Sequence, residues 1–311
     1  QTVSNIAKWN GSSWSSVGTG IAGSVFSLTV FNNELVAAGN FTEAGGTPAN
    51  YIAKWNGTSW LPFGSGFNAF IRAVTTHNGE LIAGGFFTSS GSTSLNRIAK
   101  WNGTEWINIG DGFNNQVYSL HSDGSFLYAG GSFTLSGSIQ LNRIAKWNGI
   151  TWSALGSGMD GIVASLYSYN NLLYAGGNFT KFNGSNVNRI IRLLPDGTID
   201  TNFNVGLGAD AIVESVIVQP DGKVVVGGRF SSFNGSVHSR LVRLNTDGSV
   251  DVSFITGAGF DKNVYCIEIQ SDSKLLVGGS FLNYKGSTAR RIIRLNSDGS
   301  SDVSFGSGAG F

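Results

Sequence analysis

The sequence predicts an all-β protein made of many short strands, and three observations carry this prediction. The 311 residues include 45 Gly but only 13% charged residues, which fits neither a helical protein nor a charge-rich disordered chain. Asn-Gly and Asp-Gly pairs, which favour two-residue hairpin turns, recur along the chain. The third observation is an internal repeat that assigns each strand its place.

The repeat is visible when the chain is compared with itself. A block reading I-A-K-W-N-G occurs four times unchanged and three times in altered form, starting at Ile6, Ile52, Ile98, Ile144, Ile190, Leu241 and Ile292. Four spacings of 46 residues are followed by two of 51. A second block, centred on glycine and followed by Phe, interleaves with the first. A fixed period of this length indicates a repeat architecture, which we expect to form one domain over residues 1–311.

Each repeat contains four expected strands. In one repeat they cover residues 117–120, 126–129 and 143–147, and the fourth begins at Trp152. Repeated units of four antiparallel strands are typical of a β-propeller. Seven blades are favoured, one of them incomplete, because residues 6–17 supply only the third and fourth strands of a blade. Six blades are the alternative, and open stacking into a solenoid is a further one.

The connections between strands are of two kinds. Strands one and two, and strands three and four, are joined by tight turns, whereas the other connections, such as 43–50 and 64–70, are longer and more varied. Up-and-down strand order places all the long connections on one face, the long-loop face. Because binding residues concentrate on loops held by a rigid scaffold, we expect function there.

Charge and hydropathy restrict the partners. With 20 basic and 19 acidic residues, the chain has no strong field for nucleic acid, and it has no apolar run long enough for membrane insertion. The expected partner is a protein or a glycan. Because the chain begins with Gln1 and its one Met is Met159, we expect it to be part of a longer chain or a larger assembly.

The repeat resembles known families. An aliphatic strand, L-Y-A-G-G, I-A-K-W-N-G and a Trp eight residues after the Ile follow one another as in a kelch repeat, over the whole chain. In the second half, segments 219–230 and 247–254 are similar to bacterial delta-60 repeats. In the first half, W-N-G-x-x-W-x-x-x-G-x-G and G-G-x-F-T are similar to repeats of the fungal cortical polarity marker and of large secreted bacterial surface proteins. The resemblance implies a secreted or cell-surface protein and no catalytic residue.

Candidate catalytic and metal-binding residues do not form a pattern. Cys266 stands in a column of Ser and Ala, which predicts a small buried residue of the first strand, and the three His residues fall in three different columns. The recurring D-G-[ST]-x-D lacks the ligand spacing of a calcium loop and is better explained by a hairpin turn with a second capping Asp. We therefore expect no catalytic residue, no metal site, no cofactor and no enzyme activity.

The tryptophans favour a lectin as the alternative function. They form two columns, represented by Trp9 and Trp14, and exposed tryptophans can stack on sugars. Because Leu193, Leu244 and Leu295 replace the Trp9 column in the second half, packing between blades is the preferred explanation for that column. The Trp14 column is expected to cover the outer edge of each blade.

One column varies in the way a binding surface should. The second position of the first strand reads Phe26, Arg72, Tyr118, Ala164, Glu214 and Tyr265, whereas its neighbours are uniformly aliphatic or small. We therefore expect the ligand or partner to be bound by Phe26, Arg72, Tyr118, Glu214 and Tyr265. The function predicted is that of a non-enzymatic, secreted or cell-surface module for recognition, adhesion or scaffolding, acting through the long-loop face. A propeller lectin is the alternative, and a propeller enzyme is less favoured.

Overall fold

The computed structural model describes residues 4–306. The chain divides into two compact units, of which unit 1 ends at Leu155 and unit 2 begins at Gly156. All the regular elements among the described residues are strands or turns, and every strand pair is antiparallel. Because no helix occurs in this part of the chain, none is available there to cross a membrane.

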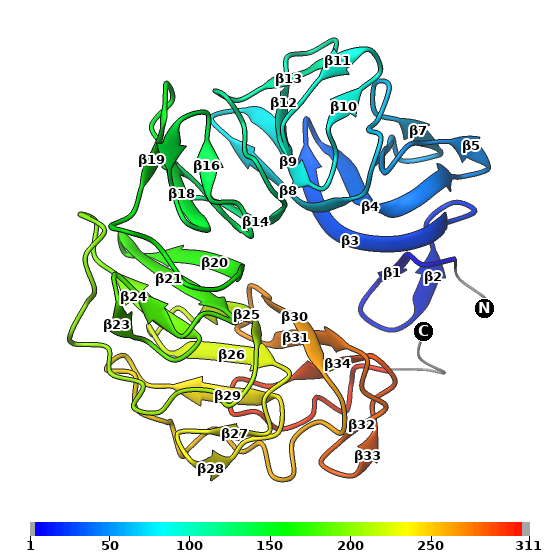
Figure 1. Cartoon of the computed structure of the whole chain (residues 1–311). Helices are drawn as coiled ribbons and strands as arrows, with labels where there is room; N and C mark the ends of the chain where they lie inside the picture. The colour runs from blue at the N-terminus through cyan, green and yellow to red at the C-terminus, as the bar shows by residue number, and fades with distance from the viewer. Residues whose placement is uncertain (1–3, 307–311) are drawn as a thin grey trace. The chain divides into compact units, whose positions relative to one another are not determined.

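Unit 1 contains three large sheets, each built from one repeat, with the strands side by side in chain order (Figure 1). They are β3 (Ile21–Phe31), β4 (Glu34–Ala44), β6 (Ile52–Trp55) and β7 (Trp60–Pro62), with β5 (Thr47–Pro48) also paired to β4; β8 (Ile71–His77), β9 (Glu80–Gly85), β12 (Ile98–Trp101) and β13 (Trp106–Asn108); and β14 (Val117–Ser122), β15 (Leu127–Gly131), β18 (Ile144–Trp147) and β19 (Trp152–Ala154). Before them, β1 (Ala7–Trp9) pairs with β2 (Trp14–Ser16). The expected four-strand blade is confirmed in these three sheets.

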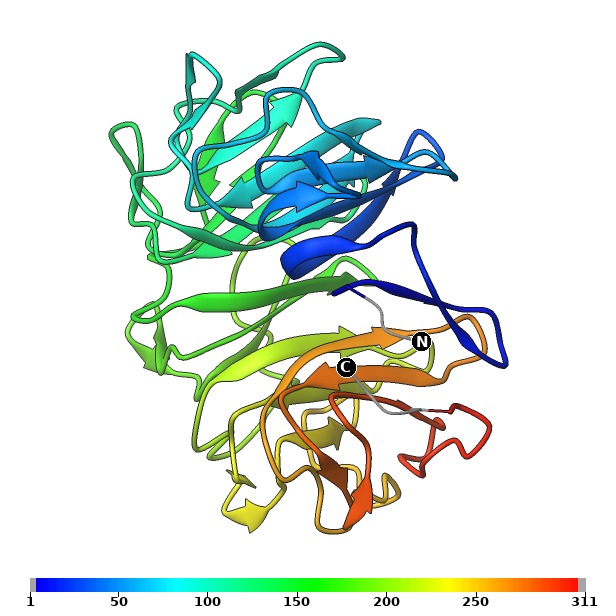
Figure 2. The ribbon, with the colours of Figure 1, turned by 90° about the vertical axis from the view of Figure 1, so that its right-hand side faces the viewer.

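Unit 2 departs from that expectation, because its three large sheets have three strands each. They are β20 (Val163–Tyr169), β21 (Leu172–Gly177) and β24 (Ile190–Leu193); β25 (Val213–Val218), β26 (Val224–Gly228) and β29 (Leu241–Leu244); and β30 (Val264–Ile269), β31 (Leu275–Gly279) and β34 (Ile292–Leu295). They lie side by side in both views of the ribbon (Figure 1, Figure 2). The expected fourth strand is reduced to a single bridge, such as that between Leu193 and Ile199.

Ion pairs take the place of the missing fourth strands. After the Asp-Gly turn, Asp200 turns back to Arg192 of β24, and 2.8 Å separates the carboxylate from the guanidinium. Arg243 with Asp251 and Arg294 with Asp302 repeat this arrangement. The second Asp of D-G-[ST]-x-D does accept backbone hydrogen bonds, as expected of a capping residue. Its ion pair with the third strand was not predicted.

Small hairpins occupy the connections between the second and third strands. These pairs are β10 (Ser89–Ser90) with β11 (Thr93–Ser94), β16 (Leu135–Ser136) with β17 (Ile139–Gln140), β22 (Lys181–Phe182) with β23 (Ser185–Asn186), β27 (Ser232–Phe233) with β28 (Ser236–Val237), and β32 (Asn283–Tyr284) with β33 (Ser287–Thr288). The long connections are thus ordered by their own backbone pairing.

The core of each unit lies between consecutive sheets. In unit 1, Val36 and Ile52 of one sheet pack with Leu81 and Trp106 of the next. In unit 2, Val216 and Val226 share a cluster with Ile190 of the preceding sheet. Removal of these side chains from water stabilises the stacking of sheets within each unit, and it holds the first strands of neighbouring sheets in contact.

Candidate functional site

The variable column found in the sequence lies at a β-bulge in every repeat. The pairing of the first strand with the second shifts between Ile71 and Ala73 in unit 1, between Val213 and Ser215 in unit 2, and at the equivalent point of the other four repeats. The residues inside these shifts are Phe26, Arg72, Tyr118, Ala164, Glu214 and Tyr265. A bulge takes its extra residue out of the ladder and re-aims its side chain. The column can therefore vary without disturbing the sheet.

Glycine makes the bulge possible. A Cβ atom on Gly85, the second glycine of its pair, would lie 2.5 Å from the Phe70 carbonyl oxygen and 2.8 Å from the Ile71 Cα. Side chains do not approach a backbone so closely, so the partner strand needs glycine opposite the bulge. The glycine block that marks the repeat thus also shapes the candidate site.

In unit 1 three of the predicted residues come together. The Arg72 guanidinium lies over the Phe26 ring at 5.0 Å and over the Tyr118 ring at 5.5 Å. Phe70 stacks on Phe86 at 4.1 Å, and these two rings contact Phe26 and Tyr118 respectively, at 6.1 and 5.6 Å. We call these five residues the Arg72 cluster. It is an aromatic surface with one cation at its centre.

Among the described residues, Arg72 has no partner for its charge. It forms no ion pair or hydrogen bond with any residue between 4 and 306, and its Nε is buried without a hydrogen-bond partner. Contact with aromatic faces offsets about 0.5–2 kcal/mol of the cost of partial burial, but it does not satisfy the guanidinium N–H donors. The guanidinium N–H groups of Arg72 have the chemistry to donate hydrogen bonds to an anionic group.

In unit 2 the predicted residues are arranged differently. Glu214 accepts a 2.6 Å hydrogen bond from Arg229, so this charge is already neutralised. Arg229 also lies 5.9 Å from the ring of Tyr265, which is 45% exposed. Hydrogen bonds with Ser280 and Asn263, and then the charge of Arg229, lower the pKa of Tyr265. Ala164 contributes no functional group.

The sequence reasoning missed Phe70, Phe86 and Arg229. Each lies next to the bulge, either just before the first strand or just after the glycine pair. Their columns also vary, since the residue after the last glycine of this block reads Asn40, Phe86, Ser132, Asn178, Arg229 and Ser280. That variation was the signal that could have identified them.

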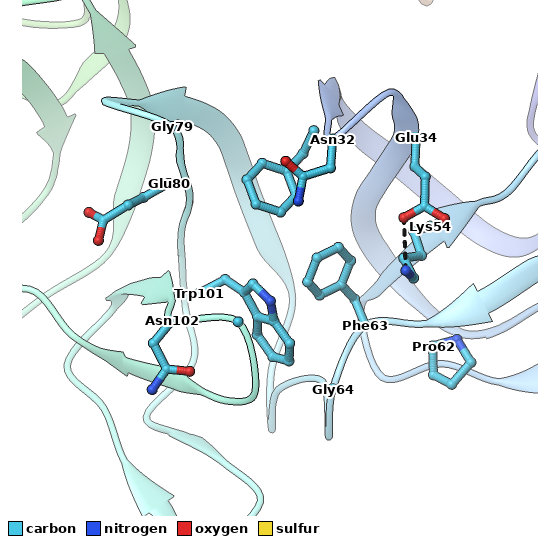
Figure 3. A pocket seen from close by; sticks show the side chains of 12 residues that line it. Asn32, Glu34, Lys54, Pro62, Phe63, Gly64, Gly79, Glu80, Trp101 and Asn102 are labelled. Carbon is cyan, nitrogen blue, oxygen red and sulfur yellow. Dashed lines mark hydrogen bonds and ion pairs between the residues drawn. The ribbon is translucent and has the colours of Figure 1, made fainter.

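A second candidate site is a pocket of about 490 Å³ in unit 1. It opens among the tight turns that follow β3, β8 and β12, away from the bulges. Figure 3 shows Glu34 and Lys54 joined at one side of the pocket, with Phe63 and Trp101 beside each other. The Lys54 ammonium lies 2.8 Å from Glu34, and the Trp101 ring meets Phe63 edge-on at 4.9 Å.

The tryptophan columns both pack between repeats, although only the first was predicted to do so; Trp101 of that column contacts Phe63 of the preceding repeat. Members of the second column, Trp60, Trp106 and Trp152, are buried, and each donates its indole N–H to a backbone carbonyl of the preceding repeat, at Val17, Phe63 and Ile109. This column packs between the sheets and was wrongly placed at the outer edge. In the first column Trp55, Trp101 and Trp147 are half-buried. Part of each of these rings is accessible.

The remaining chemical candidates are Cys266 and the histidines. Cys266 is exposed, so its predicted burial was wrong; the column's blade-to-blade contact is made instead by residues such as Ser215, whose hydroxyl accepts the Ile267 N–H at 3.1 Å. Burial lowers the pKa of His77, whose ring nitrogen lies 2.8 Å from the Ser122 hydroxyl. Within residues 4–306, no three His, Cys, Asp or Glu side chains are grouped as metal ligands.

Comparisons with known proteins concern the fold. Residues 170–203, 219–254 and 270–305 match DUF5122, described as a β-propeller domain of unknown function. No curated protein matches the sequence. The chain is therefore an all-β propeller with antiparallel blades, and segments of its second half match the DUF5122 propeller model. The number of blades and the resemblance to kelch repeats stay predictions.

Solved structures agree with this fold. The chain is similar to the WD40 β-propeller domain of Doa1, with a TM-score of 0.59 at 14% identity over 86% of this chain and 79% of that one. It is also similar to the extracellular domain of the one component system BT4673 from B. thetaiotaomicron, with a TM-score of 0.58 at 12% identity over 88% of this chain and 34% of that one. The computationally designed protein Ika8 has a TM-score of 0.53 at 12% identity, over 89% of this chain and 85% of its own. The chain thus spans about a third of the length of the bacterial sensor chain.

Proposed function

We propose that this propeller is a non-enzymatic recognition module, secreted or displayed at the cell surface, that binds a protein partner through the Arg72 cluster. The observation that carries the proposal is the half-buried Arg72 guanidinium, which has aromatic contacts but no anionic partner in the described chain. The partner expected is a protein segment that presents an Asp or Glu carboxylate.

The chemistry of the cluster supports a protein partner. Aromatic residues and Arg are enriched among the residues that dominate the affinity of protein interfaces. Phe26 is 41% exposed, so apolar surface remains available beside the cation. A carboxylate could accept two hydrogen bonds from the guanidinium while neighbouring apolar groups of the partner cover the rings.

The scaffold supports recognition by the bulge residues. Each bulge lies in a sheet whose core is packed against its neighbour, so the backbone at these positions is held by the sheet. Because the bulge residue is outside the ladder, each repeat can carry a different side chain at the same place. Such variation from repeat to repeat suits selective binding, because selectivity depends on the whole set of bulge side chains. A catalytic site would instead depend on a few fixed residues.

Two similarities are the grounds for proposing a location outside the cytoplasm. The resemblance to secreted bacterial repeat proteins favours it, and so does the similarity to the extracellular domain of a bacterial sensor. In that sensor the matching region is part of a much longer chain, and we propose the same arrangement here.

The test uses a displayed library of random peptides as the probe. Peptides selected on the wild-type protein should be enriched in Asp or Glu next to apolar residues. Arg72→Ser should weaken their binding by about tenfold or more, since a hydrogen bond to a charged group contributes about 1.5–3 kcal/mol. The exposed Lys8 provides the control, because Lys8→Ser removes one positive charge from unit 1 outside the cluster and should leave binding within about twofold. Peptides bound equally by the Arg72 variant would refute the site.

A further inference from the structure

The pocket beside Trp101 combines aromatic rings with a closed ion pair. Phe31 of β3, Phe63 just after β7 and Trp101 of β12 supply three rings, and Glu34 and Lys54 supply opposite charges. We propose that this pocket binds one neutral pyranose unit of a glycan. This site is separate from the Arg72 cluster and does not depend on the function proposed for it.

The indole N–H groups of Trp101 and of its neighbour Trp106 differ in their hydrogen bonding. The N–H of Trp106 is used by the Phe63 carbonyl at 3.2 Å, whereas the Trp101 N–H has no hydrogen-bond partner among the described residues. Trp101 is only half-buried, and its ring lies at the pocket beside Phe63 (Figure 3). It offers both an aromatic surface and a free donor at its edge, an amphipathic combination suited to a ligand with apolar and polar faces.

The charges in the pocket favour a neutral ligand. Lys54 and Glu34 are 2.8 Å apart and neutralise each other, so neither an anion nor a cation gains a strong net attraction. The Lys54 ammonium uses one of its N–H donors on Glu34 Oε2, while Oε1 of Glu34 has no partner within residues 4–306. Both side chains are partly exposed, at 31% and 26%, and together they can donate to and accept from hydroxyl groups.

A pyranose matches these features. One face of the sugar ring is made of C–H groups that can stack on an aromatic ring, and its edge carries hydroxyls that donate and accept hydrogen bonds. The volume of about 490 Å³ lies within the range of small-molecule sites. A purely apolar ligand would leave the Glu34 oxygen and the Trp101 N–H without partners, and a charged ligand would compete with the existing ion pair.

The chain itself provides matched variants. Leu193, Leu244 and Leu295 stand in the Trp101 column in unit 2, so Trp101→Leu is a replacement that this type of repeat already tolerates. Trp147 is the equivalent residue one repeat later, where Phe31 and Phe63 are replaced by His77 and Ile109. Trp147→Leu therefore removes the same atoms from an equivalent place that lacks the other two rings.

The test measures titrations with free glucose, galactose, mannose, fucose and N-acetylglucosamine. All eight tryptophans lie in unit 1, so a saturable change in tryptophan fluorescence reports on that unit alone. We expect at least one sugar to bind with a millimolar dissociation constant, about tenfold weaker for Trp101→Leu and unchanged for Trp147→Leu. Glu34→Gln should also weaken binding, because the amide accepts less strongly than the carboxylate.

Three outcomes would overturn the proposal. They are no saturable binding of any of these sugars up to about 50 mM, equal binding by wild type and Trp101→Leu, and an equal loss in both tryptophan variants. Arg72→Ser should leave sugar binding unchanged, so a failure here is distinguishable from a failure of the peptide-binding site.

Discussion

Arg192 and Asp200, eight residues apart, form a buried ion pair that fixes the segment following β24. Their charged groups are 2.8 Å apart, and both side chains are less than a tenth exposed. The guanidinium also donates to the Thr246 carbonyl at 2.6 Å, and Asp200 accepts the Asn202 N–H at 2.9 Å. The pair connects the segment after the turn to its own sheet, and the Thr246 contact connects that sheet to the next.

Loss of the Asp200 charge should destabilise unit 2 strongly. Asp200→Asn leaves the Arg192 guanidinium buried without a counter-charge, and breaking a buried pair in this way costs about 3–5 kcal/mol. Because unit 2 contains no tryptophan, the free energy of unfolding should be measured by circular dichroism during urea denaturation. The control is Asp196→Asn in the same motif, where the carboxylate is exposed and accepts hydrogen bonds from Thr198. Equal effects of the two substitutions on the free energy of unfolding would contradict a structural role for the ion pair.

Acid should weaken unit 2. Hydrogen bonds from Lys274 and Ser304 hold the pKa of Asp302 well below its usual range. Burial alone would raise the pKa of Asp251, but hydrogen bonds from Lys223 and Ser253 outweigh it, so that pKa is low as well. Because the folded pKa lies below the unfolded value of about 3.9, the unfolded chain binds more protons in acid. The stabilisation is complete above the unfolded pKa and is lost as the pH falls toward the folded pKa.

The measurement compares two signals during acid titration from neutral pH. Circular dichroism follows both units, and tryptophan fluorescence follows unit 1. We expect part of the circular dichroism signal to be lost at a higher pH than the tryptophan signal. Asp251→Asn should reduce stability at neutral pH and make it less dependent on pH below about 4, since the titrating group is gone. An unchanged acid profile in this variant would show that Asp251 does not contribute.

Much of the fold could be predicted from the sequence because the repeats reveal their own alignment. The period locates the strands, and Asn and Gly mark the tight turns; Asn32 and Asn33, for example, have φ angles of 49° and 63°. The fourth strand predicted for each repeat of unit 2 was wrong. The segment that forms a strand at Trp152 in unit 1 corresponds to the segment of unit 2 that ends at Asp200, which is held by an ion pair with Arg192 instead. Turn residues identify a chain reversal, but they do not tell whether the returning segment pairs as a strand.

The candidate site was only partly accessible from sequence. Variation in one column pointed to Arg72, but the bulge depends on how two strands pair, and no single residue type specifies it. The pocket could not be predicted because Phe31 and Trp101 lie on strands of two sheets and Phe63 lies in the connection after β7, far from both in the sequence. The prediction that Cys266 is buried was wrong. In earlier repeats the equivalent residues, such as Ser165 and Ser215, contact the first strand of the next repeat, whereas Cys266 is exposed in the described part of unit 2.

The bulge beside Arg72 should depend on the glycine opposite it. Gly85→Ala places a Cβ 2.5 Å from the Phe70 carbonyl oxygen and 2.8 Å from the Ile71 Cα, and overpacking of this kind costs about 1–3 kcal/mol. Because relief of the clash must move the backbone that carries Arg72, the variant should also weaken binding of the selected acidic peptides. Urea denaturation followed by tryptophan fluorescence measures the first effect, and the peptide titration measures the second.

Gly79 provides the matched control for this prediction. It has a φ of 77° and open space around its Cα, and Asn33 occupies the equivalent position one repeat earlier. Gly79→Asn should therefore change stability by no more than about 0.5 kcal/mol, because Asn tolerates a positive φ. If Gly85→Ala were equally mild and bound the peptides normally, the partner strand would accommodate a side chain opposite the bulge. The glycine pair would then not be what holds Arg72 in place, and packing among Phe26, Phe70 and Tyr118 would have to do so.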